Sequence, residues 1–262
     1  MKRKKRFKKD SRRRGIYILP NIFTSLNIFC GFYAVISSIN GSFAAAAISV
    51  ILAVVFDALD GKIARATNTT SRFGVEYDSL ADLISFGLAP GVMMYLWALK
   101  PLGRIGWLAA FLFMVCGALR LARFNTYVGT QSGAYFTGLP IPAAAGMVAT
   151  TVLFCKRFGI AGNANPAVLL VMLYMLAFLM VSYIKYNSFK EKPELFRRMN
   201  FNVLVAVILI LIFVAAQPSI ALFLLGLAYV ISGPLTTIRR YMNARHSKAA
   251  ASELDKPKSS PV

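Results

Sequence analysis

The feature that most constrains the fold of this chain is its alternation of long apolar runs with short polar gaps. We count eight apolar runs, near residues 18–39, 43–61, 79–99, 104–124, 141–155, 166–185, 201–216 and 218–237. A helix needs about 20 apolar residues to cross a bilayer core, and several runs reach that length. The sequence therefore predicts an all-α, polytopic transmembrane bundle of about eight spans. Because the run 141–155 is short, a seven-span bundle is the alternative.

The charged residues are few and unevenly placed. They make up 15% of the chain, against roughly 25% in a soluble domain, so we expect no separate soluble domain. With the N-terminus in the cytoplasm and eight spans, all but four of the 30 Lys and Arg residues fall on the cytoplasmic side. The four exceptions are Lys100, Arg104, Lys156 and Arg157. Since basic residues concentrate in cytoplasmic loops, this distribution predicts that both termini are cytoplasmic.

The polar ends set the domain boundaries. Residues 1–17 form a basic arm with ten Lys and Arg, residues 18–240 the membrane domain, and residues 241–262 a polar tail expected to be disordered. The arm should attract anionic lipid headgroups. It has one aromatic residue, Phe7, so it lacks the stacking platform of a nucleic-acid binder. The single histidine, His246, lies in the tail, where we expect it to be solvated.

Half of the ten acidic residues fall within one short region, at the cytoplasmic ends of the second and third spans. They are Asp57, Asp60, Glu76, Asp78 and Asp82. Spacings of three and four residues place the aspartates of each pair on one helix face. The linker between the pairs turns the chain back, so the four carboxylates can converge. Acids at the end of a membrane span are costly and usually functional.

Four converging carboxylates would repel one another unless cations neutralise them. Two divalent cations would cancel four negative charges, and oxygen ligands without nearby His or Cys favour Mg²⁺, Mn²⁺ or Ca²⁺ over zinc. Paired metals of this kind hold the oxygens of a phosphoryl group. Small residues, Gly61, Ala64 and Gly74, lie among the acids and would let a nucleotide approach the backbone. Arg65 is placed to grip its phosphates.

These residues carry a family resemblance. The segment 57–82 fits the pattern D-x2-D-G-x2-A-R-x8-G-x3-D-x3-D at all eight fixed positions, and it resembles the signature of the CDP-alcohol phosphatidyltransferases. The resemblance covers the motif and the layout of about six spans, with the last two outside the common core. It implies that Asp57, Asp60 and Asp78 are metal ligands. Asp82 would lie near the metals as a further ligand and the general base.

The resemblance also implies a nucleotide site and a reaction. Gly61, Ala64 and Gly74 would accommodate the cytidine nucleotide, and Arg65 would contact its phosphates. Asn21 and Thr24 in the first span could hydrogen-bond the nucleotide or headgroup, although helix capping explains them equally well. The expected reaction transfers the phosphatidyl group of CDP-diacylglycerol to an alcohol and releases CMP. It would occur at the cytoplasmic face of the cell membrane.

Four flanking segments favour serine as the acceptor alcohol. They read LPNIFTSLN, SFGLAP, ALRLARFN and FTGLPIP, at residues 19–27, 85–90, 118–125 and 136–142, and they resemble the phosphatidylserine synthase branch. Arg120 or Arg123 could bind the serine carboxylate, with Asn125 nearby. Membrane anchoring by these arginines is the alternative. The glycerophosphate branch has Lys after the last motif Asp, where this chain has Leu83.

Other functions stay open at this point. The same chemistry on glycerol 3-phosphate, inositol or inositol phosphate is one alternative, and an ion transporter that uses intramembrane acids is another. Small apolar residues in the last two spans could also build a homodimer interface, which nothing in the sequence specifies. Binding of cytidine nucleotides in the presence of divalent cations would separate the enzyme from the transporter.

Overall fold

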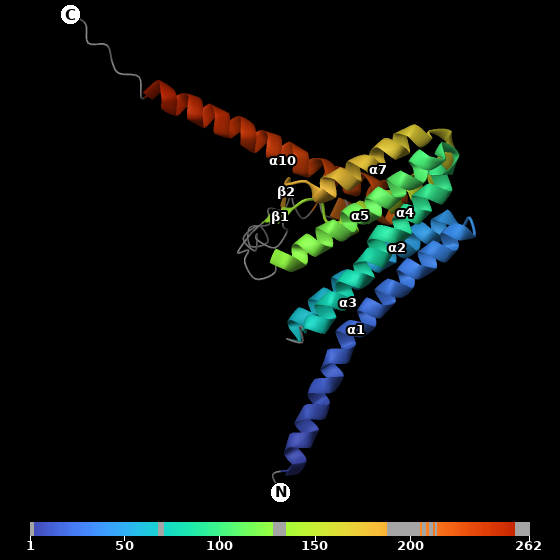
Figure 1. Ribbon diagram of the computed structural model, residues 1–262, viewed down its shortest axis with the longest axis vertical. Coiled ribbons are helices and arrows are strands. Elements are labelled where there is room, and N and C mark those ends of the chain that lie inside the picture. The colour runs from blue at the N-terminus through green and yellow to red at the C-terminus, as the bar shows by residue number, and fades with distance from the viewer. Residues whose placement is uncertain are drawn as a thin grey trace, which may run out of the picture.

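The fold is built from long helices that run side by side (Figure 1). The computed structural model describes residues 3–67, 71–127, 135–187, 205, 208–209, 212 and 214–254. The principal helices are α1 (Arg3–Ile39), α2 (Phe43–Ala66), α3 (Arg72–Asp82), α4 (Ala89–Met94), α5 (Arg104–Tyr127), α6 (Ile141–Arg157), α7 (Pro166–Val181) and α10 (Pro218–Leu254).

Five helical stretches are long and apolar enough to cross a membrane. They are Pro20–Ile39, Phe43–Ala66, Arg72–Leu102, Arg104–Thr126 and Pro218–Thr237. Four of them match the first four predicted spans, and the fifth matches the eighth. The helices α6 and α7 cover the predicted fifth and sixth spans with 17 and 16 residues. A helical fold with several helices of membrane-spanning length is therefore confirmed. Most of the predicted span 201–216 lies outside the described residues, so the count of eight stays a prediction.

The first two spans form a tight helical hairpin. Its turn contains Gly41, which has a φ of +73°, a conformation that glycine adopts without strain. Fully buried small residues, including Ala34, Ala46 and Ala47, lie in this part of the bundle. Close backbone approach through small residues is how helices associate in lipid, where burial of apolar surface gives little net driving force.

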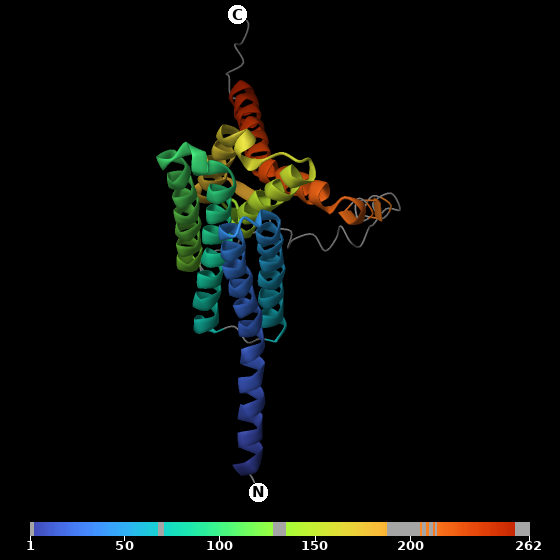
Figure 2. The same cartoon turned by 90° about the vertical axis from the view of Figure 1, so that its right-hand side faces the viewer.

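The third span is one rod made of several helical types. After α3 it continues through π-helical turns η1 (Leu83–Leu88) and η2 (Tyr95–Leu99), with α4 between them, and ends in the 3₁₀ turn η3 (Lys100–Leu102). Gly91 packs on α5, since a Cβ there would lie 3.1 Å from the carbonyl oxygen of Ala110. Figure 2 shows this rod upright beside α1, α2 and α5.

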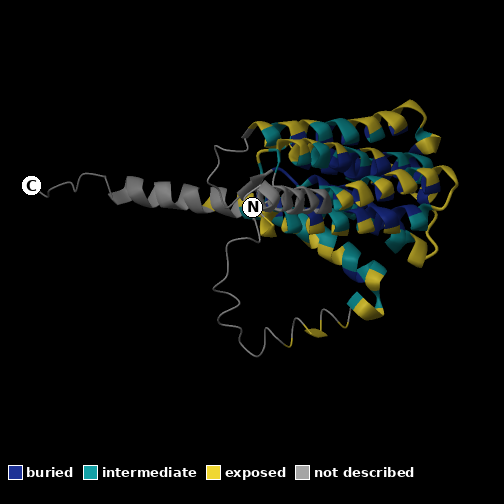
Figure 3. Cartoon of the chain, turned by 90° about the horizontal axis from the view of Figure 1, so that it is seen from below, coloured by how far each residue is buried: buried dark blue, intermediate teal, exposed yellow. Residues whose placement is uncertain are grey.

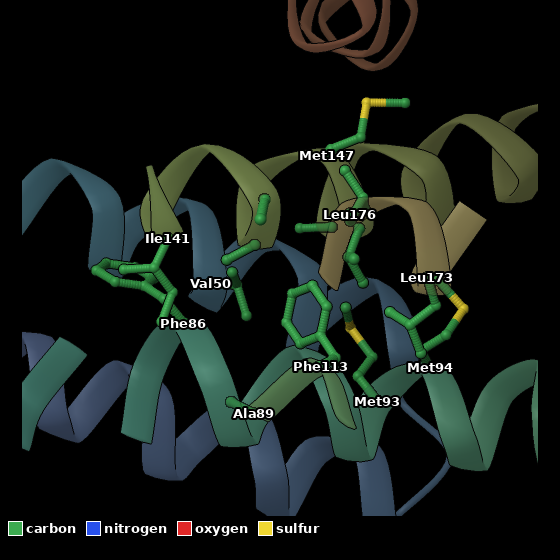
Figure 4. Packing of buried hydrophobic residues seen from close by; sticks show 14 of the residues in the cluster. Val50, Phe86, Ala89, Met93, Met94, Phe113, Ile141, Met147, Leu173 and Leu176 are labelled. Carbon is green, nitrogen blue, oxygen red and sulfur yellow. The ribbon is translucent and has the colours of Figure 1, made fainter. Parts of the chain in front are cut away.

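The core lies between these rods and α6 and α7. Phe86, Phe113 and Met93 are fully buried, and Figure 4 shows their side chains pointing into this core. Exposed positions follow the outer surface of the helices (Figure 3). Large apolar side chains such as Phe29 and Phe32 are among them, as expected for a surface that faces lipid.

Two local features differ from the sequence-based expectation. A three-residue strand, β1 (Tyr135–Thr137), pairs antiparallel with β2 (Lys185–Asn187), a small addition to a fold that is otherwise all-α as predicted. In addition, α10 continues to Leu254, where a disordered tail beginning at residue 241 was predicted. The stretch 241–254 has no Gly or Pro and four alanines, a composition with high helix propensity, so the helix of the last span continues through it.

Candidate active site

The four aspartates come from two helices that meet at one end of the bundle. Asp57 and Asp60 lie near the end of α2, and Asp78 and Asp82 lie on α3. Ser71 caps α3, because its Oγ accepts a hydrogen bond of 3.0 Å from the backbone N–H of Gly74. This cap satisfies a backbone donor in the first helical turn. It fixes where α3 begins and therefore which face carries its two acids.

Three of the carboxylates form a compact group. One oxygen each from Asp57, Asp60 and Asp78 lies within 4.8 Å of the others. Asp60 is buried and accepts a hydrogen bond of 3.0 Å from the hydroxyl of Thr24 on α1. The Oδ1 atom of Asp78 is also buried and has no hydrogen-bond partner among the described residues. A buried carboxylate oxygen without a donor, beside two further acids, fits a bound cation.

Asp82 lies apart from this compact group, one helical turn beyond Asp78. It is 8% exposed, and its Oδ1 accepts a hydrogen bond of 3.3 Å from the side-chain amide of Asn27. It is near enough to the other three acids to interact with them electrostatically. The structure therefore brings all four predicted aspartates to one place, with Asp82 held by a neutral donor.

Asn27 is a site residue that the sequence analysis missed. It is fully buried, and its Oδ1 has no partner within the described part of the chain. The backbone carbonyl of Asn27 accepts a hydrogen bond of 2.8 Å from Ser85, which ties the first span to η1. A signal was present, since Asn21, Thr24 and Asn27 recur every three residues and so form a polar stripe in an apolar helix.

A pocket opens beside the compact group. It comprises about 590 Å³ of space, part of it open to solvent, and Asp60 and Asp78 contribute to its wall. All six residues expected around a nucleotide line it: Asn21, Thr24, Gly61, Ala64, Arg65 and Gly74. The structure thus brings these residues together from α1, α2 and α3. Their roles in binding stay predictions.

The two motif glycines keep this pocket open. A Cβ at Gly74 would lie 3.2 Å from the Ser71 hydroxyl and 3.8 Å from the Asn21 side-chain oxygen. A Cβ at Gly61 would lie 3.6 Å from the guanidinium of Arg65. Larger side chains at either position would therefore fill space in this pocket.

The residues predicted for acceptor binding do not share one environment. Arg120 on α5 interacts electrostatically with Asp82, and its buried Nε has no hydrogen-bond partner among the described residues. Arg123 instead donates a hydrogen bond of 3.1 Å to the carbonyl of Val181, and its guanidinium lies 5.4 Å from the ring centroid of Tyr183. Asn125 donates to the Ser79 hydroxyl at 3.0 Å. Arg120 thus faces the site, whereas Arg123 and Asn125 make contacts that hold helices together.

Comparison with known proteins identifies the family. A sequence profile described as CDP-alcohol phosphatidyltransferase matches residues 17–183. A Helicobacter pylori protein named CDP-diacylglycerol–serine O-phosphatidyltransferase is 38% identical over 218 residues, which cover 83% of this chain and 90% of that protein. A Bacillus subtilis protein of the same name is 36% identical over 173 residues, 66% of this chain and 92% of that protein. An archaetidylserine synthase from Methanothermobacter thermautotrophicus is 44% identical over 138 residues, 52% of this chain and 58% of that protein. The profile match and these identities, together with the acidic cluster and its pocket, make the chain a member of the CDP-alcohol phosphatidyltransferase family.

Proposed function

We propose that this protein transfers the phosphatidyl group of CDP-diacylglycerol to the hydroxyl of L-serine, giving phosphatidylserine and CMP. The observation that carries the proposal is the compact group of Asp57, Asp60 and Asp78, which borders a pocket lined by Gly61, Gly74 and Arg65. The serine acceptor is supported by relatives whose names specify serine as the substrate. The proposal also agrees with the segments flanking the signature.

The acidic group is suited to divalent cations. Asp57, Asp60 and Asp78 would hold them, with Asp82 close by, and two Mg²⁺ or Mn²⁺ ions would balance the four carboxylates. Bound there, such ions would stabilise negative charge on the reacting phosphate and on the leaving CMP. The donor set contains hard oxygen ligands alone, which disfavours zinc and other softer metals.

The nucleotide would occupy the pocket beside these acids. Its phosphates are negatively charged, and Arg65 supplies a guanidinium at the pocket wall that can pair with two phosphate oxygens. Asn21 and Thr24 offer further polar groups from α1 in the same pocket lining. The acyl chains would remain in the lipid, because the outer surface of these helices is apolar.

The acceptor would approach from the side of Asp82 and Arg120. The carboxylate of Asp82 takes the proton from the serine hydroxyl, and the amide of Asn27 holds that carboxylate in place. The serine oxygen then forms a bond to the phosphorus bound to the lipid. The bond from this phosphorus to the CMP oxygen breaks, and CMP leaves with the electron pair. Arg120 pairs with the carboxylate of serine and so presents the hydroxyl toward the acids.

We further propose that this site faces the cytoplasm in a multi-pass membrane protein. The basic arm 1–17 leads into the first span at the end that carries Asn21 and Thr24, and basic segments favour the cytoplasmic side. The arm would also hold the site near anionic lipids. Protease cleavage of the C-terminal tail in inside-out vesicles, and protection in right-side-out vesicles, is the expected result. The reverse pattern would contradict this orientation.

The function is tested with the purified full-length protein in detergent–lipid micelles. Radiolabelled serine should enter the lipid phase when CDP-diacylglycerol and Mg²⁺ or Mn²⁺ are both present, with one CMP released per lipid formed. Asp60→Asn should abolish incorporation. The exposed acid Glu76 provides the matched control, so Glu76→Gln should retain activity. Incorporation of glycerol 3-phosphate or inositol in place of serine would overturn the acceptor assignment, and failure to bind cytidine nucleotides would overturn the proposed function as a whole.

A further inference from the structure

The last described helix, α10, lies outside the residues matched by the family profile, yet it reaches the candidate active site. Its first residues lie at the opposite end of the bundle, where Arg157 at the end of α6 donates a hydrogen bond of 3.4 Å to Gln217. From there it crosses the bundle toward β2 and Arg120. Its path therefore brings some of its side chains close to the candidate active site.

A buried tyrosine on β2 fixes the position of α10. Tyr186 is fully buried, and its hydroxyl donates a hydrogen bond of 3.2 Å to the carbonyl of Val230. Gly233 makes room for its ring, since a Cβ there would lie 2.2 Å from the ring carbon Cζ. The ring of Tyr229 packs against that of Tyr186, with centroids 5.6 Å apart. This packing sets the register of α10 and the direction of Tyr229.

Tyr229 also lies near Arg120. Its phenol is near enough to the guanidinium of Arg120 for the two groups to interact electrostatically, and Arg120 interacts in the same way with Asp82. A line of polar groups thus leads from the acids through Arg120 to α10. Along this line the charge changes from negative at Asp82 to positive at Arg120, and a hydroxyl donor follows at Tyr229.

This order of groups matches an acceptor that carries both a hydroxyl and a carboxylate. The hydroxyl end must approach the acids and the phosphate, whereas the carboxylate is repelled by the acids and needs donors farther away. Arg120 offers N–H donors, including the buried Nε without a partner among the described residues, and a phenol offers one O–H donor. A neutral polyol would offer these donors no negative charge, and a hydrogen bond to a charged group is stronger than one to a neutral group.

We propose that Tyr229 and Arg120 together form the subsite for the carboxylate of the acceptor, so that α10 contributes to the choice of a hydroxy amino acid as substrate. The inference rests on the proposed function, because it names the part of that site that selects the acceptor. Tyr229 then binds the acceptor and has no role in binding the nucleotide.

The test combines a change in the protein with a change in the acceptor. Tyr229→Phe removes the hydroxyl and keeps the ring that packs on Tyr186. We expect the KM for L-serine to rise about tenfold or more, as for loss of a hydrogen bond to a charged group, with the KM for CDP-diacylglycerol unchanged. L-serinamide lacks the carboxylate, so the variant and the wild type should use it equally well. Tyr174→Phe, on α7, serves as the control and should match the wild type with both acceptors.

The outcomes separate this inference from the function on which it rests. If the wild type uses serine and Tyr229→Phe has the wild-type KM for it, the subsite is wrong and the function stands. An equal loss with serine and serinamide would also overturn the subsite, because the hydroxyl would then serve something other than the carboxylate. A wild type that transfers nothing to serine would instead refute the proposed function. Arg120→Gln provides a second test of the subsite, since this variant should impair the use of serine far more than the use of serinamide.

Discussion

Removing one negative charge from the acidic group should stabilise the metal-free protein. Oxygens of Asp57, Asp60 and Asp78 lie within 4.8 Å of one another. At an effective dielectric constant of about 20, two unit charges at that separation repel by about 3.5 kcal/mol. Neutralising Asp78 removes two such pairs, which is about 7 kcal/mol of repulsion before screening. Because Arg65 and solvent screen this repulsion, we expect a gain of about 1–2 kcal/mol in the free energy of unfolding.

Asp78 is the best position for this change. Its Oδ1 has no hydrogen-bond partner among the described residues, so Asp78→Asn breaks no hydrogen bond of that atom within this part of the chain. The new amide can also donate to the neighbouring carboxylates. Asp60 is less suitable, because it accepts a hydrogen bond from Thr24 that an amide could weaken.

The assay is thermal unfolding in detergent, followed through the fluorescence of Trp97 and Trp107 after removal of divalent cations with EDTA. A gain of about 1–2 kcal/mol corresponds to a rise of about 2–8 °C in the midpoint for a chain of this size. Added Mg²⁺ should stabilise the wild type, since a ligand bound to the folded state alone raises its stability. It should stabilise Asp78→Asn much less.

Glu76→Gln is the control for the loss of one acid near the site, because Glu76 is exposed and outside the compact group. It should leave the unfolding midpoint unchanged relative to the wild type, both in EDTA and with added Mg²⁺. If Asp78→Asn and Glu76→Gln unfold at the same temperature in EDTA, and Mg²⁺ stabilises them equally, the three carboxylates neither repel one another nor share a cation.

Three further predictions follow from the same geometry. Asp82→Asn should lower kcat at least 100-fold, as for loss of a general base, with binding of cytidine nucleotides retained; near-normal turnover would exclude Asp82 from that role. Gly74→Val should raise the KM for CDP-diacylglycerol by filling the pocket, whereas Gly146→Ala, where a Cβ meets nothing within 4 Å, should leave it unchanged. Gly233→Ala should lower the melting temperature, because the new Cβ would overlap the Tyr186 ring. Gly226→Ala is the control and should be tolerated, because its Cβ would lie 3.4 Å from the Met147 sulfur. Equal melting temperatures for the two variants would refute the fixed register of α10.

The convergence of the aspartates could be predicted because it depends on local rules. Spacings of three and four residues place Asp57 with Asp60 and Asp78 with Asp82 on one face, and a short linker returns the chain. The residues that line the proposed nucleotide pocket could be predicted for the same reason, since most of them flank the acids along two helices. The first four spans were equally clear, because each is a predominantly apolar run of membrane-spanning length.

Other features depend on contacts between residues far apart in the sequence. Arg120 and Arg123 looked equivalent, and what separates them is a carbonyl 58 residues beyond Arg123, at Val181. Tyr229 is a single polar group in an apolar run, and its relation to Arg120 depends on how Tyr186 packs against α10. The pairing of β1 with β2 likewise joins segments with two helices between them, and three-residue strands leave no pattern to detect.

The π-helical turns of the third span place a constraint on chain length. An ordinary helix advances about 100° per residue, whereas a π-turn holds an extra residue within the turn. Directly after Asp82, η1 therefore changes the angular phase between the acids on α3 and the small residues that pack on α5. Deleting one residue from η1 would rotate one set by about 100° relative to the other. Side chains in this segment can be substituted, but the number of residues in it is fixed. The segment must keep the acids in the site and the small residues against α5 at the same time.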